Sequence, residues 1–350
     1  MITGVYFVIG LVCLLGGAQL LVGSSSRLAT RFGVPSIFIG ITVVAFATSA
    51  PEVAVSLDAI FTSKSSLALG NVLGSNIANI LLILGISSLI APIKIQERII
   101  WLDIPVMILA SVVVYLLSLD QALEPVDGGI LLLLFAGFMT FQIVQAGRER
   151  NVEKVQEATD VSKSITRQTL LFFAGLGILV LGGHFLVQSA IEIARFWGLS
   201  ELVIGLTIVA IGTSLPEIAT SVLAAWRKEA DLSVGNVIGS NIFNIFLVLG
   251  ITALFSSGGI EVRSAALALD FPFMIAVSIA CLPIFFTAHK IARWEGALFL
   301  GYYAAYMIYL FMDSSQHQLL PLFNNVMVLF VAPITVVTLV VLAYRYNKYL

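Results

Sequence analysis

The chain has 350 residues, of which 59% are hydrophobic and 11% are charged. Soluble domains carry about 25% charged residues, so this composition excludes a soluble globular protein. The net charge of −2 gives no reason to expect a nucleic-acid partner. Because apolar segments of about 20 residues can cross a bilayer core of roughly 30 Å, the sequence predicts an all-α polytopic membrane protein.

Hydropathy and segment length predict eleven membrane spans. These are expected at residues 3–26, 34–60, 66–90, 99–119, 126–146, 169–194, 200–225, 231–255, 265–287, 293–312 and 321–344. The first ten form two sets of five, in residues 1–146 and 169–312, and the charged segment 147–168 is expected to be a cytoplasmic linker between them. The eleventh span lies in residues 313–350, outside both sets.

Positive charges are distributed unevenly between the predicted loops. Fifteen Lys and Arg residues fall in one set of alternate loops, which includes the linker and the C-terminus, and three (Lys64, Arg195 and Arg263) fall in the other. Loops rich in Lys and Arg stay in the cytoplasm. We therefore expect the N-terminus outside and the C-terminus inside, in a plasma or inner membrane.

Two stretches of the chain repeat one another. Residues 40–90 (GITVVAFATSAPEVAVS through GNVLGSNIANILLILGISSLI) and 205–255 (GLTIVAIGTSLPEIATS through GNVIGSNIFNIFLVLGITALF) align without a gap, with 26 of 51 positions identical. Five spans per set is an odd number, so the second set is predicted to enter the membrane in the opposite direction. Secondary transporters commonly bind their substrate between such inverted repeats, near the midplane.

Each repeat places polar side chains on one helix face. Thr48 and Ser49 precede Glu52 by four and three residues, and Ser75 precedes Asn79 by four, spacings that bring side chains together on a helix. Pro51 is expected to break the helix and to leave the carbonyls of residues 45–48 unpaired. The second repeat supplies matching residues: Thr213, Ser214, Glu217, Ser240 and Asn244.

All of these donors are oxygens, without a thiolate or an imidazole. That set suits a hard cation such as Ca²⁺ or Na⁺ rather than zinc or copper. Two ionised Glu side chains match the charge of one Ca²⁺, and they would repel one another in a low-dielectric site without a cation or protons. Intramembrane acids without a basic partner are functional by default, so Glu52 and Glu217 are the strongest candidates.

Other polar residues in the spans admit a structural interpretation. Asn71, Asn76, Asn236 and Asn241 are expected to bond backbone between helices or to join the site. Asp103 and Asp270 each precede a proline by two residues. We expect them to cap helix N-termini, with a role in ion access as the alternative.

The segments ATSAPE and GTSLPE, followed by GNVLGSNIAN and GNVIGSNIFN, resemble the two alpha repeats of the sodium/calcium exchanger family. The resemblance covers residues 1–312. It implies a ten-helix core of two inverted repeats, with ions bound between the second, third, seventh and eighth helices, and a sliding pair formed by the first and sixth. Matched by motif, the implied ligands are Glu52, Asn79, Glu217, Thr48, Ser49, Thr213, Ser214, Ser75, Ser240 and the carbonyls of Ala45 and Ala210.

One position departs from the family pattern, because some members have Asp where this chain has Asn244. We include Asn244 in the predicted metal site and expect its neutral amide to bear on the number of Na⁺ ions exchanged. The predicted function is a secondary active antiporter of Ca²⁺ and Na⁺, with no resident cofactor and no enzymatic activity. A proton/calcium antiporter at the same site is the alternative, and a passive cation channel is a weaker one.

Overall fold

The structure is a computed structural model that describes residues 2–62, 65–149, 165–197, 210–286 and 289–338. Almost all of the elements formed by these residues are helices. Within the described ranges, nine helices are long and apolar enough to cross a membrane. The prediction of an all-α polytopic membrane protein is therefore confirmed.

The first half of the chain begins with one long helix and continues through helices interrupted by π-helical stretches, labelled η. Its elements are α1 (Ile2–Phe32), α2 (Ser36–Ile39), η1 (Gly40–Val44), α3 (Ala45–Thr48), α4 (Ala50–Phe61), α5 (Ser65–Ala78), η2 (Asn79–Leu84), α6 (Gly85–Ile90), β1 (Ile93–Lys94), η3 (Ile99–Asp103), α7 (Ile104–Leu117), β2 (Ala122–Leu123) and α8 (Pro125–Arg148).

The second half follows the same order. Its elements are α10 (Ile165–Phe196), α12 (Ala210–Gly212), α13 (Leu215–Trp226), α14 (Ala230–Phe243), η5 (Asn244–Leu249), α15 (Gly250–Phe255), β3 (Ile260–Glu261), η6 (Ala266–Asp270), α16 (Phe271–Phe286), β4 (Lys290–Ile291) and α17 (Arg293–Ser314). Two further elements, α18 (Leu320–Val326) and η7 (Met327–Val331), come after them.

Local structure recurs between the halves in detail. The π-helical stretches η2 and η5 both begin at an asparagine of the repeat, Asn79 and Asn244. Helices α8 and α17 each start with an acid, Asp127 and Glu295, whose carboxylate accepts the backbone N–H three residues earlier, at 2.8 and 2.7 Å. The sequence repeat is therefore accompanied by a repeat of helix breaks, π-helices and helix caps.

Two short antiparallel strand pairs connect the halves. β1 pairs with β4 through Ile93 and Ile291, and β2 pairs with β3 through Leu123 and Ile260. Each of these four isoleucine and leucine side chains is fully buried. The connection before α7 thus lies beside the connection before α17, and the connection after α7 lies beside the one before α16.

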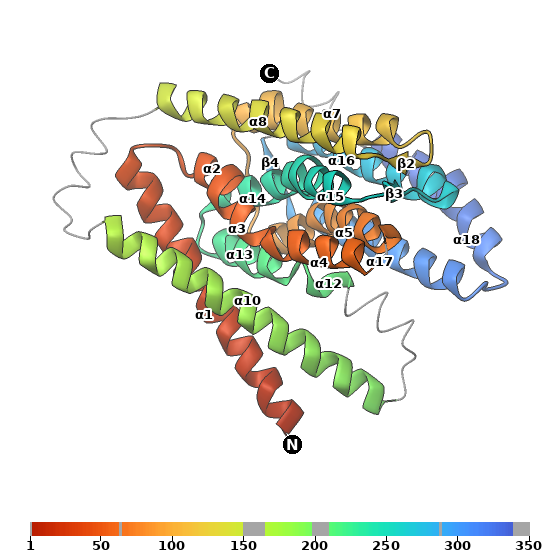
Figure 1. Cartoon of the computed structure of the whole chain (residues 1–350), viewed down its shortest axis with the longest axis horizontal. Helices are drawn as coiled ribbons and strands as arrows, with labels where there is room; N and C mark the ends of the chain where they lie inside the picture. Colours follow the sequence, from red (N-terminus) through yellow and green to blue (C-terminus); the bar gives the residue numbers. More distant parts are fainter. Residues whose placement is uncertain (1, 63–64, 150–164, 198–209, 287–288, 339–350) are drawn as a thin grey trace.

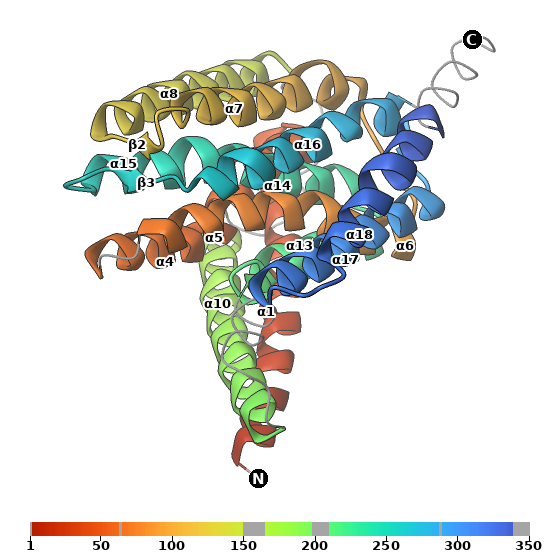
Figure 2. The ribbon, with the colours of Figure 1, turned by 90° about the vertical axis from the view of Figure 1, so that its right-hand side faces the viewer.

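Helices α1 and α10 form a crossed pair that runs at a steep angle to the stacked helices of the rest of the chain (Figures 1 and 2). The two helices are antiparallel, since Gly10 lies against Gly182 and Gly17 against Gly175. A Cβ on Gly17 would lie 2.5 Å from the Leu179 backbone nitrogen. Such contact requires glycine, because small residues let helix backbones approach closely in membranes.

The observed helices differ from the predicted spans mainly at two ends. α1 continues six residues past the predicted end at residue 26, to Phe32, and α10 begins at Ile165, so residues 165–168 are helical rather than part of the linker. The two extensions hold each other, because Arg27 donates from Nε to Gln168 Oε1 at 2.6 Å. Residues 150–164 of the linker and 200–209 of the seventh predicted span lie outside the described residues.

Candidate cation site

Both candidate glutamates lie in the first turn of a helix that follows a break. α3 ends at Thr48, Ser49 forms a turn, and α4 begins with Pro51 in its first turn. In the second half α12 ends at Gly212, and α13 starts in the same way with Pro216. The positive end of each helix dipole therefore points toward a carboxylate, Glu52 or Glu217.

The break does not free the Ala45 carbonyl as the sequence suggested. The Ala45 oxygen accepts the Ser49 N–H at 2.9 Å and also lies 3.4 Å from Thr48 Oγ1. Pro51 lacks the N–H that would bond the carbonyl four residues earlier, that of Ala47. The Ala45 oxygen keeps the ordinary helical bond to Ser49. A carbonyl has a second lone pair, so Ala45 stays a predicted ligand, as does Ala210, the first described residue of α12.

The carboxylates of Glu52 and Glu217 are buried, each with 1% of its residue surface exposed. Within the described part of the chain, none of their four oxygens has a hydrogen-bond partner. Among the described residues no Lys or Arg forms an ion pair with either of them. The Glu217 carboxylate lies beside the Thr48 and Ser49 hydroxyls and is exposed to the charge of Glu52, so the two halves bring their acids to one place.

Two asparagines present their amide oxygens to the same region. Asn79 donates from Nδ2 to Asn241 Oδ1 at 3.0 Å, and Asn244 donates from Nδ2 to Asn76 Oδ1 at 3.1 Å. This reciprocal exchange uses the nitrogen of each site asparagine and leaves its oxygen. The Oδ1 atoms of Asn79 and Asn244 are buried and without a hydrogen-bond partner.

The other four asparagines connect helices. Asn71 donates to Ser56 Oγ at 3.1 Å, and Asn236 donates to Ser221 Oγ at 2.9 Å, each joining the two helices of one hairpin. Asn76 donates to the Asn241 carbonyl at 3.3 Å. These contacts support the structural interpretation, in which the four amides join helices.

The hydroxyl groups fall into two sets. Ser49, Ser240 and Thr213 have buried hydroxyl oxygens with no hydrogen-bond partner. Ser214 donates instead to Ser75 Oγ at 3.2 Å, across the boundary between the halves. Thr220 was not predicted, although its buried hydroxyl also lacks a partner and lies three residues after Glu217. Its counterpart in the first repeat is Val55, so a search for polar residues shared by both repeats misses Thr220. Helical spacing from Glu217 would have identified it.

The two sides of the site are not equivalent. Thr48 donates to Asn236 Oδ1 at 3.1 Å, and both side chains are packed inside the protein. Their counterparts, Thr213 and Asn71, instead line a cavity of about 310 Å³ that also reaches Ser75. On one side of the site a hydrogen bond therefore joins Thr48 to Asn236, whereas on the other side their counterparts line a cavity.

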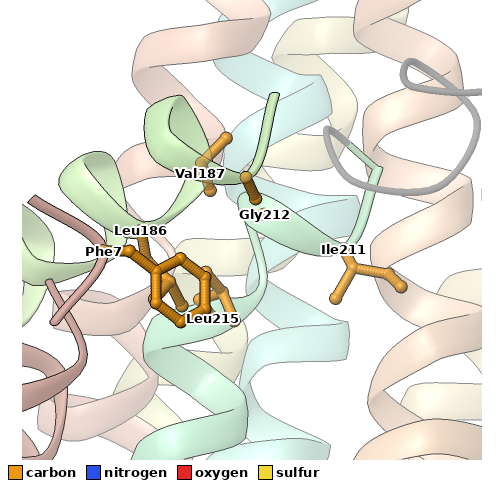
Figure 3. Close-up of a pocket in the computed structure, with 7 residues that line it drawn as sticks. Phe7, Leu186, Val187, Ile211, Gly212 and Leu215 are labelled. Carbon is orange, nitrogen blue, oxygen red and sulfur yellow. The ribbon is translucent and has the colours of Figure 1, made fainter. Parts of the chain in front are cut away.

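A second cavity, of about 260 Å³, lies between α10 and the break before α13 and is lined by apolar residues only (Figure 3). Leu186 and Val187 of α10 face Ile211, Gly212 and Leu215 across it. It offers no ligand to a cation. Close packing at its edge depends on glycine, since a Cβ on Gly212 would lie 2.6 Å from Val187 Cγ2.

Neither aspartate caps a helix as expected. Asp103 makes no side-chain cap at the start of α7, because a π-helical stretch runs continuously into that helix. It binds Arg98 and Gln142 instead. Asp270 lies at the corresponding junction of η6 and α16, and its Oδ1 accepts the Tyr306 hydroxyl at 3.1 Å.

Comparison with known proteins supports the interpretation of this geometry as a cation site. A family model described as sodium/calcium exchanger protein matches residues 2–144 and 167–312. The chain is 35% identical to the "Putative antiporter CaxA" of Alkalimonas amylolytica over 321 residues, covering 89% of this chain and 99% of that protein. It is 31% identical to the "Sodium/calcium exchanger MaX1" of Methanosarcina acetivorans over 343 residues, covering 87% and 97%.

Solved structures agree with the sequence matches. A structure of the sodium-calcium exchanger NCX_Mj superposes with a TM-score of 0.75 at 32% identity and covers 87% of this chain and 97% of that one. The resemblance seen in the two repeats is thereby confirmed, and transporters rather than enzymes are the relatives. The chain belongs to the sodium/calcium exchanger family and is a multi-pass membrane antiporter of the cation/calcium type.

Proposed function

We propose that the chain exchanges Ca²⁺ for Na⁺ by alternating access at the site between its two repeats. The observation that carries this proposal is a group of buried oxygens without hydrogen-bond partners, supplied by both halves: Glu52, Glu217, Asn79, Asn244, Ser49, Ser240 and Thr213. Leaving buried polar atoms unsatisfied costs about 1–3 kcal/mol each, so such a group is expected where a ligand completes it.

The chemistry of the group favours Ca²⁺ and Na⁺. Hard cations take carboxylate, amide and hydroxyl oxygens, and Ca²⁺ accepts six to eight of them in flexible geometry. Among the described residues no three His, Cys, Asp or Glu side chains are grouped so that they could hold a metal ion. Most of the proposed ligands are therefore neutral. The two carboxylates supply the charge that one Ca²⁺ would balance.

The contacts between the halves support an inverted arrangement. Were the repeats to enter the membrane in the same direction, the loop of β1 would share a surface with the corresponding loop of β3. β1 pairs with β4 instead, and β2 pairs with β3. The antiparallel course of α1 and α10, the first helices of the two halves, is the other sign of inversion.

The charge distribution supports an N-terminus outside and a cytoplasmic C-terminus, in a plasma or inner membrane. In this orientation the hydrogen bond between Thr48 and Asn236 closes the cytoplasmic side. The cavity that reaches Thr213 and Asn71 lies toward the outside. The structure then corresponds to the outward-facing member of the transport cycle.

Repulsion between the two acids explains why exchange is coupled. Two ionised carboxylates in a site without bulk water oppose each other unless a cation lies between them. A carrier without its ion is therefore disfavoured in passing from one side to the other. The glycine-packed pair α1 and α10 is the unit that would slide against the remaining helices.

The test is uptake of radiolabelled Ca²⁺ by proteoliposomes loaded with Na⁺, K⁺ or H⁺. We expect uptake to require an outward Na⁺ gradient at fixed pH, and Glu52→Gln and Glu217→Gln each to abolish it. Full transport by either variant would refute the site. Uptake driven by H⁺ alone would establish a proton/calcium antiporter, and flux that trans ions do not accelerate would establish a channel.

A further inference from the structure

Asp103 and Asp270 occupy corresponding positions in the two halves, in the segments WLDIPVM and ALDFPFM. Asp103 is fully buried and paired with Arg98, which also lies 3.6 Å from Glu149. Asp103 Oδ2 lies 3.2 Å from Arg98 Nη1, and Asp103 Oδ1 accepts the Gln142 amide at 2.8 Å. Arg98 is itself held by Gln142 Oε1 and by the Phe38 ring, 4.1 Å from its guanidinium carbon. This aspartate is a structural ion-pair partner.

The second half replaces both of these partners by apolar residues. Ala265 stands where the first half has Arg98, and Leu310 stands where it has Gln142. Among the described residues, the hydrogen bond to the Asp270 side chain comes from the Tyr306 hydroxyl, at 3.1 Å. No described Lys or Arg forms an ion pair with it. Asp270 is also only partly buried, so the second half retains a carboxylate and lacks the groups that would neutralise it.

Asp270 lines two cavities. The larger, of about 310 Å³, extends to Asn71, Ser75 and Thr213 at the candidate cation site. The smaller, of about 200 Å³, extends to Ser66 and to the exposed side chains of Glu261 and Arg263 near the loop 256–264. The carboxylate therefore stands between the end of the helices and the predicted ligands.

We propose that Asp270 recruits the transported cation at the face of the loop 256–264, before the cation reaches Glu52 and Glu217. This inference rests on the proposed function. A carboxylate between low-dielectric walls raises the local concentration of cations and their rate of association. It makes no contribution to the final ligand set. Removing it raises the KM for the ion and leaves the maximal rate unchanged.

The recruitment is one-sided, because the carboxylate at the corresponding position of the first half, Asp103, is paired with Arg98. The KM of the ion presented at the other face is therefore independent of Asp270. This separates recruitment from a general effect on the fold, which would change transport measured from both faces.

The experiment measures initial Ca²⁺ uptake against Ca²⁺ concentration in right-side-out and inside-out vesicles, at low and high salt. The variants are Asp270→Asn, Asp270→Glu and, as a matched control, Asp58→Asn. Asp58 is an exposed acid near the end of α4 and lines neither of the two cavities. Its substitution removes the same charge and leaves Asp270 in place.

For Asp270→Asn we expect the KM to rise roughly three- to tenfold at the face of the loop 256–264, with an unchanged maximal rate and a smaller difference at high salt. Asp270→Glu retains the low KM, as does Asp58→Asn. An unchanged KM in Asp270→Asn, an equal rise at both faces, or a loss of maximal rate alone overturns the proposal. In each of these cases the proposed function still stands if the wild-type protein exchanges the ions and Glu52→Gln abolishes that exchange.

Discussion

Among the described residues, the hydroxyl of Ser49 is buried and has no hydrogen-bond partner, whereas several other buried serine hydroxyls bond to the carbonyl three or four residues earlier. Ser111, for example, donates to the Met107 carbonyl at 3.0 Å. A side chain that is unsatisfied in the protein alone contributes to ion binding at the expense of stability. The two properties can be separated by substitution.

We predict that Ser49→Ala lowers the apparent Ca²⁺ affinity by roughly three- to tenfold, or about 0.7–1.4 kcal/mol, because one ligand is lost. Its melting temperature without ions is expected to equal or exceed that of the wild type. Ser111→Ala, the control, leaves the affinity unchanged. Thermal unfolding with and without Ca²⁺ measures both quantities, and a normal Ca²⁺-induced shift in Ser49→Ala would exclude Ser49 from the site.

Asn244 is the position at which the resemblance to the exchanger family leads us to expect a difference in charge, since some members have Asp there. Its Nδ2 donates to Asn76 Oδ1 at 3.1 Å, and its own Oδ1 has no partner. An aspartate here would place a carboxylate oxygen against the side-chain oxygen Oδ1 of Asn76. It would also add one negative charge to the site that contains Glu52 and Glu217. Protons or further cations must then balance that charge.

We predict that Asn244→Asp makes Ca²⁺ uptake depend more steeply on the Na⁺ gradient, because a third acid requires an additional monovalent cation. The Hill coefficient for Na⁺ in proteoliposomes measures this change. Uptake at two pH values distinguishes added Na⁺ from an added proton. A Hill coefficient equal to that of the wild type would show that the residue at 244 does not set the coupling ratio.

At the scale of the elements, glycines bring the backbones of α1 and α10 into close contact. A Cβ on Gly182 would lie 2.4 Å from the Leu14 backbone nitrogen, whereas a Cβ on Gly16 would meet nothing within 4 Å. The same substitution therefore has opposite consequences at two glycines of one pair. This contrast tests whether close approach of the two helices is needed.

We predict that Gly182→Ala lowers the melting temperature and the transport rate, since the added methyl group forces the two backbones apart. Overpacking of this kind costs about 1–3 kcal/mol. Gly16→Ala, the matched control, is expected to be neutral or stabilising by about 0.5–1 kcal/mol, because alanine favours helix over glycine. Equal behaviour of the two variants in thermal unfolding and Ca²⁺ uptake would contradict the role given to the α1–α10 contact.

The sequence predicted the all-helical fold from hydropathy and segment length, and it proposed the site residues from their periodic spacing. Glu52, Thr48 and Ser49 share a face by counting alone, and the offset of 165 carries the face to Glu217. The exchange of amides between Asn79 and Asn241 could not be foreseen, because it depends on how two distant helices cross. The same holds for Arg98, whose partner Asp103 was expected to cap a helix.

The strand pairs and π-helices left no usable signal either. Two residues such as Ile93 and Lys94 are too few for an alternating pattern to appear. A π-helix bonds groups five residues apart instead of four, a difference that an apolar stretch such as Asn79–Leu84 does not reveal. These features depend on the packing of the assembled halves.

At the scale of the whole molecule, the segment after α17 contributes little to the packed interior. The apolar stretch Leu320–Thr338 is long enough to cross the membrane, and none of it is buried. Its contacts with the core include Tyr302, whose hydroxyl lies 2.6 Å from Thr335 Oγ1. A lipid-facing helix of this kind can be removed without opening a cavity.

We predict that a chain ending at Ser314 keeps the melting temperature and the Na⁺-dependent Ca²⁺ uptake of the full chain. Tyr302→Phe, which removes only the hydroxyl at this contact, controls for the loss of that hydrogen bond and is expected to be neutral. Thermal unfolding and uptake in proteoliposomes are the measurements. Loss of transport at an unchanged melting temperature would instead assign this helix to an assembly of several chains.

The strand pairs between the halves bear on the origin of the molecule. β1 of the first half pairs with β4 of the second, and β2 pairs with β3. Since β1 corresponds to β3 and β2 to β4, the two pairs make the same contact with the roles of the halves exchanged. This reciprocity is the hallmark of an isologous interface between two copies of one subunit. A single five-helix unit that inserts into the bilayer in both directions would make the same contacts with its twin. The present chain has the organisation of such a homodimer joined into one polypeptide, with the charged segment 147–168 as the linker.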